Sequence, residues 1–369
     1  MIKFLDLKKV NDLYEPRLSH AIKRVVESGR YVGGGELERF ESLMKGVSGA
    51  DYVIPTGNGL DALTLILEGY KFAGKLKTGD EVIVPANTYI ATFLAVWRAG
   101  LTPVAVDADR LTMNIDFGKI ESAVTERTRA IIIVHLYGKI AFDSRLAELK
   151  KKYSLLVIED CAQSIGAKLN SVSCGSLGNA SAFSFYPTKN VGAMGDGGAV
   201  ATSDVELADV IRSLSNYGSD RRYHNIYKGV NSRLDAIQAA VVNLKLESID
   251  EISSRRVCRA ALYERLIDND DIVKPMFSDD FSNVYHQYVV RTRHRDLFRE
   301  FLLKHGIETD CHYDVAAIDQ PCCSGEFIGD YEVTREIAST CVSLPIGDHL
   351  DESQCRMIAE VVNKFKANR

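Results

Sequence analysis

The run SLLVIEDCAQ at residues 154–163 places five mostly apolar strand residues, LLVIE, directly before a carboxylate, Asp160. Apolar side chains on both faces of a strand, here over residues 154–158, predict a strand that is covered on both sides, as in a parallel sheet. Similar strands are predicted at 51–54, 81–84, 102–106, 130–135 and 180–186, and helices at 60–69, 88–98 and 142–152. This alternation predicts an α/β, doubly wound protein with a mostly parallel central sheet, whose ligand lies at the carboxyl ends of the strands.

The pattern changes beyond residue 245. A strand is predicted at 285–291, a helix at 295–305 and a further strand at 307–311. The last helix opens with the capping-box spacing of Asp351 and Gln354 and repeats apolar side chains on one face, at Cys355, Ile358, Val361 and Phe365. The sequence therefore predicts a large domain with an N-terminal arm over residues 1–245 and a smaller C-terminal α/β domain over 246–369.

The composition describes an ordinary globular protein. The 369 residues include 45 Lys+Arg and 50 Asp+Glu, for a net charge of −5, and 46% are hydrophobic. Without a basic run, the charge pattern predicts no nucleic-acid partner and no membrane association. No apolar run approaches the ~18–20 residues of a membrane helix and the start lacks a signal-peptide pattern, so we expect a cytoplasmic protein. The eight cysteines contain no CxxC pair and are interpreted as core thiols without a metal site.

Three polar features follow predicted strands. Asp160 is a partly buried carboxylate that needs a partner, unless it only caps the next turn. Lys189 lies in SFYPTKN before a glycine-rich run, where a lysine of lowered pKa is suited to Schiff-base chemistry, although most lysines are merely solvated. The loop TGNG at residues 56–59 opens a predicted helix, where backbone N–H groups hold phosphate.

The same glycine loop, extended to Ala62, also fits the GxGxxA pattern of a dinucleotide-binding fold. A nicotinamide site requires an acidic residue at the end of the next strand. Here Asp80 and Glu81 lie at the start of that strand, and its end is followed by Tyr89. The pattern therefore fits a nicotinamide-dependent oxidoreductase poorly.

Taken together, these features are complementary parts of a site for pyridoxal 5′-phosphate (PLP). The glycine loop can hold the phosphate, Tyr89 can cover a flat ring, Asp160 can pair with a protonated ring nitrogen, and Lys189 can react with the aldehyde. A carboxylate beside the pyridine nitrogen is what the electron-sink chemistry of PLP requires.

At these residues the chain resembles the DegT/DnrJ/EryC1 family of PLP-dependent nucleotide-sugar aminotransferases, which have the fold type I of aspartate aminotransferase. The resemblance covers essentially the whole chain. It is carried by SGRYVGGG, TGNGLDAL, PANTYIAT, VHLYG, IEDCAQSIGA, FSFYPTKNVGAMGDGGA, the segment ending in GVNSRLDAIQAA, and the pair His312-Tyr313.

The resemblance implies a role for each matching residue. Lys189 would attach the cofactor and act as general acid and base, and Asp160 would be the partner of the ring nitrogen. The other cofactor contacts would be Gly57, Asn58, Tyr89, Gln163, Ser184 and, from the neighbouring subunit, Asn231, which implies a homodimer with shared active sites. The implied substrate contacts are Tyr31, Tyr217, Arg221, Tyr223, His312 and Tyr313; for the exposed basic stretch among them, the alternative is a solvated polar loop.

Within this family, the VHLYG run is typical of members that act at C3 of the sugar. The resemblance thus predicts transfer of an amino group from L-glutamate to C3 of a dTDP-linked 3-keto-6-deoxyhexose, for glycan or lipopolysaccharide biosynthesis. A proline that follows His-Tyr in many relatives is replaced here by DVAA, so the sugar stays open. The alternatives are a C4 aminotransferase, a sugar 3-dehydratase, in which a histidine would replace Lys189, and a non-catalytic PLP-binding regulator.

Overall fold

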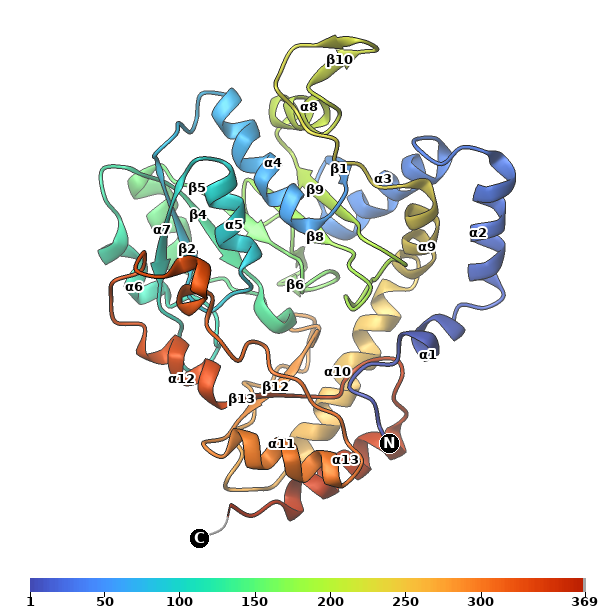
Figure 1. The fold of residues 1–369 in the computed structure, drawn as a ribbon, viewed down its shortest axis with the longest axis vertical. Helices are drawn as coiled ribbons and strands as arrows, with labels where there is room; N and C mark the ends of the chain where they lie inside the picture. The colour runs from blue at the N-terminus through green and yellow to red at the C-terminus, as the bar shows by residue number, and fades with distance from the viewer. Residues whose placement is uncertain (368–369) are drawn as a thin grey trace.

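The computed structural model describes residues 1–367 and is built around a seven-stranded sheet (Figure 1). All strands run parallel except one, β9, which is antiparallel to both of its neighbours. The spatial order is β1 (Tyr52–Thr56), β9 (Gly198–Thr202), β8 (Ala180–Ser184), β5 (Leu156–Asp160), β4 (Thr128–Val134), β2 (Glu81–Pro85) and β3 (Thr102–Val106). The prediction of an α/β protein with a mostly parallel sheet is confirmed.

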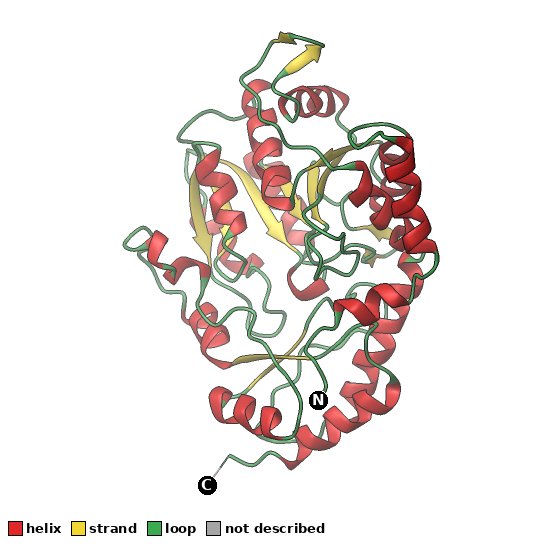
Figure 2. Cartoon of the chain, turned by 45° about the vertical axis from the view of Figure 1, so that its right-hand side comes forward, coloured by secondary structure: helices red, strands yellow, loops and turns green. Residues whose placement is uncertain are grey.

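Helices cover both faces of this sheet (Figure 2) because its strands direct apolar side chains alternately to each side. In β2, Val82 and Val84 pack with one face, whereas Ile83 packs with the other. The first face is covered by α4 (Gly59–Phe72), α5 (Ala91–Arg98) and α8 (Val205–Leu214). The second is covered by α2 (Arg17–Ser28), α3 (Gly35–Ser48), α6 (Phe117–Ala123), α7 (Ser144–Tyr153) and α9 (Ala236–Leu246).

A second apolar core lies below the sheet in the view of Figure 1. It joins a two-stranded antiparallel sheet to three helices: β12 (Tyr288–Arg291), β13 (Cys341–Leu344), α10 (Ile249–Leu266), α11 (Arg295–Lys304) and α13 (Glu352–Lys364). The start of the chain belongs to this core as well, because Ile2 is buried in it and its N–H donates to the Gly306 carbonyl at 2.7 Å. The division at residue 245, which falls just before the end of α9, stays a prediction.

One segment of the C-terminal part packs on the large sheet instead. Its packing residues lie in η2 (Ala317–Asp319) and α12 (Glu332–Thr340), and η3 (Pro321–Cys323) lies between these two elements. The buried Asp107, which follows β3, accepts hydrogen bonds from the backbone N–H (2.9 Å) and the hydroxyl (2.7 Å) of Thr334. Asp107 thus supplies the cap for the first turn of α12 from another part of the chain.

The remaining elements are short. They are α1 (Leu7–Asp12), η1 (Leu136–Gly138), the hairpin of β6 (Lys168–Leu169) and β7 (Val172–Ser173), and the hairpin of β10 (Ser219–Arg221) and β11 (His224–Asn225). The β10–β11 hairpin stands out from the rest of the chain at the top of Figure 1. No helix within residues 1–367 has the length and apolar character that crossing a bilayer demands.

Several predicted elements differ from the structure. The strand predicted at 307–311 is wrong, because Ile307 and Asp310 form only isolated bridges, to Ile2 and Ser343. The strand predicted from residue 285 begins at Tyr288, since Tyr285 turns the chain with a φ of 44°. The helix predicted from residue 88 begins at Ala91. The capping box of Asp351 and Gln354 is confirmed.

Candidate functional site

A cavity of about 420 Å³ opens at the carboxyl ends of β5 and β8, beside the N-terminus of α4. Eight of the predicted site residues line it, in segments far apart in the sequence: Asn58, Tyr89, Asp160, Gln163, Ser184, Lys189, His312 and Tyr313. Strand ends in a parallel sheet open into such a crevice, so the predicted position of the site agrees with the structure.

The N-terminus of α4 forms an anion-binding cradle at one end of the cavity. Asn58 caps the helix, with its Oδ1 accepting from the Asp61 N–H at 2.8 Å. Within residues 1–367, the N–H groups of Gly59 and Leu60 have no hydrogen-bond partner. A Cβ on Gly59 would lie 2.8 Å from the Cβ of Ser184, so only glycine lets the helix approach β8 this closely. Free N–H groups and the positive helix end favour a phosphate here.

Gly57 was predicted to contact the cofactor, but its N–H is hydrogen-bonded within the protein. Its N–H donates to the hydroxyl of Ser232 at 3.0 Å, and that hydroxyl donates to Asp61 at 2.8 Å. Gly57 is not among the residues that line the cavity. Its backbone donor is already used to fix the loop, which leaves Gly59 and Leu60 as the free donors.

Asp160 is a buried carboxylate at the end of β5. Its two oxygens accept from the Ala162 N–H and from the Thr92 hydroxyl, both at 3.1 Å. Burial raises the pKa of Asp160, and the hydrogen bond from Ala162 and the charge of Lys189 partly oppose this rise. The carboxylate is therefore held in a fixed orientation in a poorly hydrated site, where it would interact strongly with a cationic ring nitrogen.

Lys189 lies in the loop after β8 and faces the same cavity. Burial lowers the pKa of Lys189 to about 8, although the negative charge of Asp160 acts against this shift. In the part of the chain that the structure describes, its Nζ has no hydrogen-bond or ion-pair partner at normal distance. The loop itself is fixed, because the Gly192 carbonyl accepts from the buried Lys245 at 2.6 Å. A free amine with this pKa is partly neutral near pH 7 and can act as a nucleophile or base.

Aromatic and amide side chains close the other side of the cavity. Gln163 accepts from the Tyr137 N–H at 2.6 Å and donates to the Tyr313 hydroxyl at 3.0 Å. The rings of Tyr313 and Tyr89 have their centroids 5.3 Å apart. His312 is oriented through its Nδ1, 2.8 Å from the Ser343 hydroxyl. These contacts hold Gln163 and both tyrosines in place before a ligand enters.

The remaining predicted contacts lie outside this cavity. Tyr31, Tyr217, Arg221, Tyr223 and Asn231 are exposed, and Tyr223 is 87% accessible at the tip of the β10–β11 hairpin. A single chain therefore does not bring them to Lys189.

Two further residues belong to the site, Thr92 and His286, and neither was predicted from the sequence. The Thr92 hydroxyl donates to Asp160 and lies 2.8 Å from the Thr88 hydroxyl. The i, i+4 spacing of Thr88 and Thr92 is the sequence feature that could have indicated this contact. His286 lines the cavity from the turn before β12, and no local pattern marks it.

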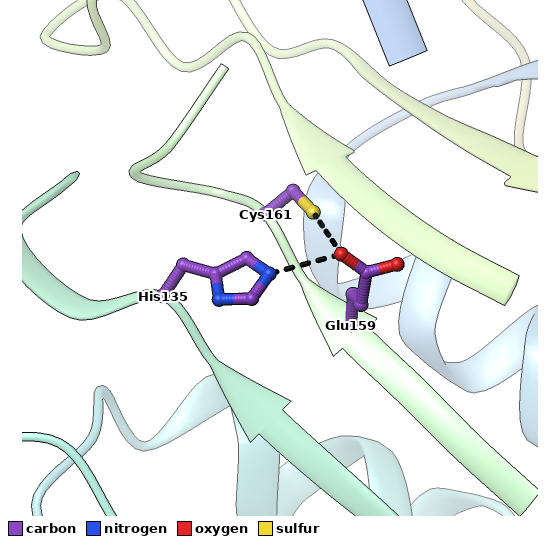
Figure 3. Close-up of side chains that lie close together, drawn as sticks. All are labelled: His135, Glu159 and Cys161. Atoms are coloured by element: carbon purple, nitrogen blue, oxygen red, sulfur yellow. Dashed lines mark hydrogen bonds and ion pairs between the residues drawn. The ribbon is translucent and has the colours of Figure 1, made fainter. Parts of the chain in front are cut away.

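A second polar cluster lies close to the site but is internally satisfied (Figure 3). His135 Nε2 lies 3.0 Å from Glu159, whose oxygens also accept from the N–H groups of Gly175 and Gly178 at 2.8 and 2.7 Å. His135 Nδ1 accepts from the Ala141 N–H at 3.0 Å. His135, Glu159 and Cys161 have the proximity of metal ligands. Because the polar atoms of His135, Glu159 and Cys161 already have hydrogen-bond partners within the protein, we interpret this cluster as structural support for the strand ends next to Asp160.

Known proteins of similar sequence agree on one family. The model of the DegT/DnrJ/EryC1/StrS aminotransferase family matches residues 14–363. The dTDP-3-amino-3,6-dideoxy-alpha-D-galactopyranose transaminase of Aneurinibacillus thermoaerophilus is 45% identical and covers 99% of both chains. The dTDP-3-amino-3,4,6-trideoxy-alpha-D-glucose transaminase of Streptomyces venezuelae is 41% identical, over 99% of this chain and 96% of its own.

Solved structures show the same relationship. The crystal structure of DesV from S. venezuelae has a TM-score of 0.94 at 40% identity and covers 98% of both chains. NtdA from Bacillus subtilis, solved with the bound cofactor PMP, has a TM-score of 0.88 at 29% identity, over 98% of this chain and 85% of its own. The predicted fold type I is thereby confirmed.

Proposed function

The chain belongs to the DegT/DnrJ/EryC1/StrS aminotransferase family, and from this premise we propose that it transfers the amino group of L-glutamate to C3 of a dTDP-linked 3-keto-6-deoxyhexose. Its class is that of the PLP-dependent aminotransferases. The proposal concerns the amino donor, the sugar and the roles of the residues. The observation that supports them best is the cavity in which Lys189 and Asp160 meet the free N-terminus of α4.

The residues of the cavity fit PLP in chemistry and in position. The free N–H groups of Gly59 and Leu60, with Asn58 and Ser184 beside them, suit a phosphate dianion. Asp160 supplies the carboxylate for the ring nitrogen, and Tyr89 supplies an aromatic surface for the ring. When bound, PLP would provide an electron sink for the carbon that loses its proton.

Lys189 is proposed to attach the cofactor and then to carry the proton. With the cofactor bound, its Nζ would move the proton of the donor Cα to the cofactor carbon that receives the amino group. Burial lowers the pKa of Lys189 to about 8, so about a tenth of the amine is neutral at pH 7, far more than for an ordinary lysine. Thr92 and the Ala162 N–H orient the Asp160 carboxylate while the charge on the ring changes. In the second half of the reaction, the same Nζ would take a proton from that cofactor carbon and deliver it to C3 of the sugar.

Two observations support C3 of a dTDP sugar. Both relatives described above carry 3-amino and dTDP in their names. The run VHLYG also contributes directly to the cavity, because Val134 and Leu136 line it and the Tyr137 hydroxyl donates to the His312 carbonyl at 2.5 Å.

A homodimer with shared sites is proposed as well. Among residues 1–367, no arginine lines the cavity, yet the proposed donor and nucleotide sugar are anions. The exposed Arg221 and Asn231 of a second copy would supply the missing polar contacts. We also place the enzyme in the cytoplasm, because charged nucleotide sugars do not cross a bilayer unaided.

The test of this function is turnover with L-glutamate and both epimers of dTDP-3-keto-6-deoxyhexose, followed by NMR of the product. We expect an amino group at C3. The matched substrates are the 4-keto isomer and the UDP-linked 3-keto sugar, on which we expect turnover at least tenfold lower. Amination at C4, or a preference for UDP sugars, would overturn the proposed substrate.

A further inference from the structure

Lys245 is a buried lysine outside the cavity that the proposed mechanism has not used. It lies in the last turn of α9 and is 4% exposed. Burial lowers the pKa of Lys245 to about 8, and the negative charge of Asp348 only partly opposes this shift. The amine is therefore mostly charged at pH 7, and a buried charge costs free energy unless its contacts compensate it. For this reason the contacts of the Lys245 amine are informative.

Two contacts of different kinds hold the Lys245 ammonium. Its Nζ donates to the Gly192 carbonyl at 2.6 Å and lies 5.8 Å from the centre of the Tyr14 ring. No carboxylate within residues 1–367 forms an ion pair with it, and Asp348 is already paired with two arginines. A methionine would fill the same space and make neither contact. The hydrogen bond and the aromatic contact are thus what a charged end adds at this position.

Gly192 belongs to the loop that carries Lys189. The loop closes on itself, because the Ala193 N–H donates to the Phe185 carbonyl at 2.8 Å. A Cβ on Gly192 would collide with the Pro187 carbonyl, so only glycine lets the two sides of the loop approach this closely. A displacement of Gly192 would therefore be passed on to Lys189 through this tight turn.

Helix α9 supports the contact firmly. Its buried face packs against α2 and α3 in one apolar core. Two turns before Lys245, Gln238 Oε1 accepts from the Met194 N–H at 2.8 Å. Residues seven apart lie on the same face of a helix, so α9 holds the loop at two points. Asn190 adds a link to the turn before β12, with its Nδ2 3.3 Å from the Val284 carbonyl. The bond from Lys245 is the shortest of the three and has a charged donor.

We propose that Lys245 is a positioning residue of this enzyme: its ammonium holds the Gly192 carbonyl, so that the loop presents the Lys189 amine to the cavity in one orientation. The Tyr14 ring keeps the ammonium in place from the N-terminal segment. A site that must place a reacting atom accurately gains from such support outside the cavity. The inference rests on the proposed role of Lys189 as the residue that attaches the cofactor and carries the proton.

The test compares how two forms of the cofactor bind to cofactor-free protein. PLP forms a bond with Lys189, whereas pyridoxamine 5′-phosphate (PMP) has no aldehyde and binds without this bond. In Lys245→Met we expect PLP to attach about tenfold more slowly, because the Lys189 amine is less often in line with the aldehyde. The dissociation constant of PMP should stay within about twofold of the wild-type value, because the residues that line the cavity are unchanged. Visible absorbance follows the attachment of PLP, and calorimetry measures the binding of PMP.

Two further variants complete the comparison. Lys245→Arg keeps a charged donor and should recover part of the PLP attachment rate. Lys274→Met is the matched control, because the half-buried Lys274 also donates to a backbone carbonyl, that of Glu264 at 2.7 Å, in the last turn of α10. This control should bind PLP and PMP as the wild type does.

Hydrogen exchange gives a readout that does not involve the cofactor. In cofactor-free Lys245→Met, we expect the backbone N–H groups of residues 186–194 to exchange about fivefold faster, while those of α4 keep their rate. In the loaded enzyme we expect kcat to fall about tenfold, with little change in KM for the sugar.

Unchanged exchange in the loop, or an unchanged rate of PLP attachment, in a Lys245→Met protein that unfolds like the wild type would overturn the proposal. So would an equal loss of PLP attachment and PMP affinity, since the whole cavity would then have changed. If Lys245→Met does not fold, Lys245→Gln takes its place with the same expectations, because its side chain is one bond shorter and ends before the Gly192 carbonyl. The proposed function fails separately, if Lys189→Ala keeps its turnover.

Discussion

Lys189 illustrates at the scale of one residue how an active site can reduce stability. A lysine whose pKa lies near 8 in the folded protein and near 10.5 when unfolded is charged in both states at pH 7. The folded state then includes the cost of a buried charge, and this cost disappears as the pH rises through 8 and the folded-state amine loses its proton.

We therefore predict that Lys189→Met stabilises the cofactor-free protein at pH 7, by about 1–3 kcal/mol, while abolishing turnover. The stabilisation by Lys189→Met should shrink between pH 8 and 10.5, because in this range the wild-type Lys189 amine loses its proton on folding. Urea unfolding of the cofactor-free proteins across this range measures it. The half-buried Lys139, whose pKa burial also lowers, is the matched control, and Lys139→Met should keep its turnover. A pH-independent difference for Lys189→Met would contradict the charge argument.

At the scale of the element, α12 depends on a residue that is 226 positions away from its second residue, Val333. Burial alone would raise the pKa of Asp107, but hydrogen bonds from Lys119 and Thr334 outweigh it and hold the pKa below the ordinary value. The carboxylate thus ties the first turn of α12 to the end of β3.

Replacing Asp107 tests this connection. Asp107→Ala leaves the N–H and hydroxyl of Thr334 and the Lys119 amine without their acceptor, so we expect a loss of about 2–4 kcal/mol in the free energy of unfolding. The exposed cap Asp351 is the matched control, where Asp351→Ala should cost about 1 kcal/mol. Because the pKa of Asp107 is lowered in the folded state, its contribution to the free energy of unfolding is complete above about pH 4 and is lost at lower pH. Equal losses for the two variants in urea unfolding would contradict a special role for Asp107.

The elements also show what could be predicted from the sequence. The strands of the central sheet were found because each has apolar side chains on both faces, and the site because Asp160 and Lys189 follow two of them. The strand β9 was missed, since Gly198 and small alanines replace the usual branched residues. His286 was missed because Arg256, Gly138 and Asn190, which fix it, come from distant segments. Such relations exist only in three dimensions.

At the scale of the whole molecule, the proposed sharing of sites between two chains predicts complementation. Lys189→Ala and Asn231→Ala chains should each be inactive or nearly so. When they are mixed and allowed to exchange subunits, half of the dimers contain one intact site, which restores about a quarter of the wild-type rate. Turnover before and after mixing measures this.

The control pairs two changes in the same half-site. Lys189→Ala mixed with Asp160→Asn should restore nothing, because both residues line the cavity of one chain and every site keeps a defect. Recovery in this control, or none in the first mixture, would contradict the shared site.

The pairing of Ile2 with the segment around Gly306 also has a consequence for biosynthesis. The first residues leave the ribosome before any of their partners, and the Glu308 N–H that donates to the Ile2 carbonyl is made about 300 residues later. The large sheet can assemble while translation continues, but the lower core closes only after the last helix has been released. Segments near residue 2 and in the last helix thus finish folding together in this core.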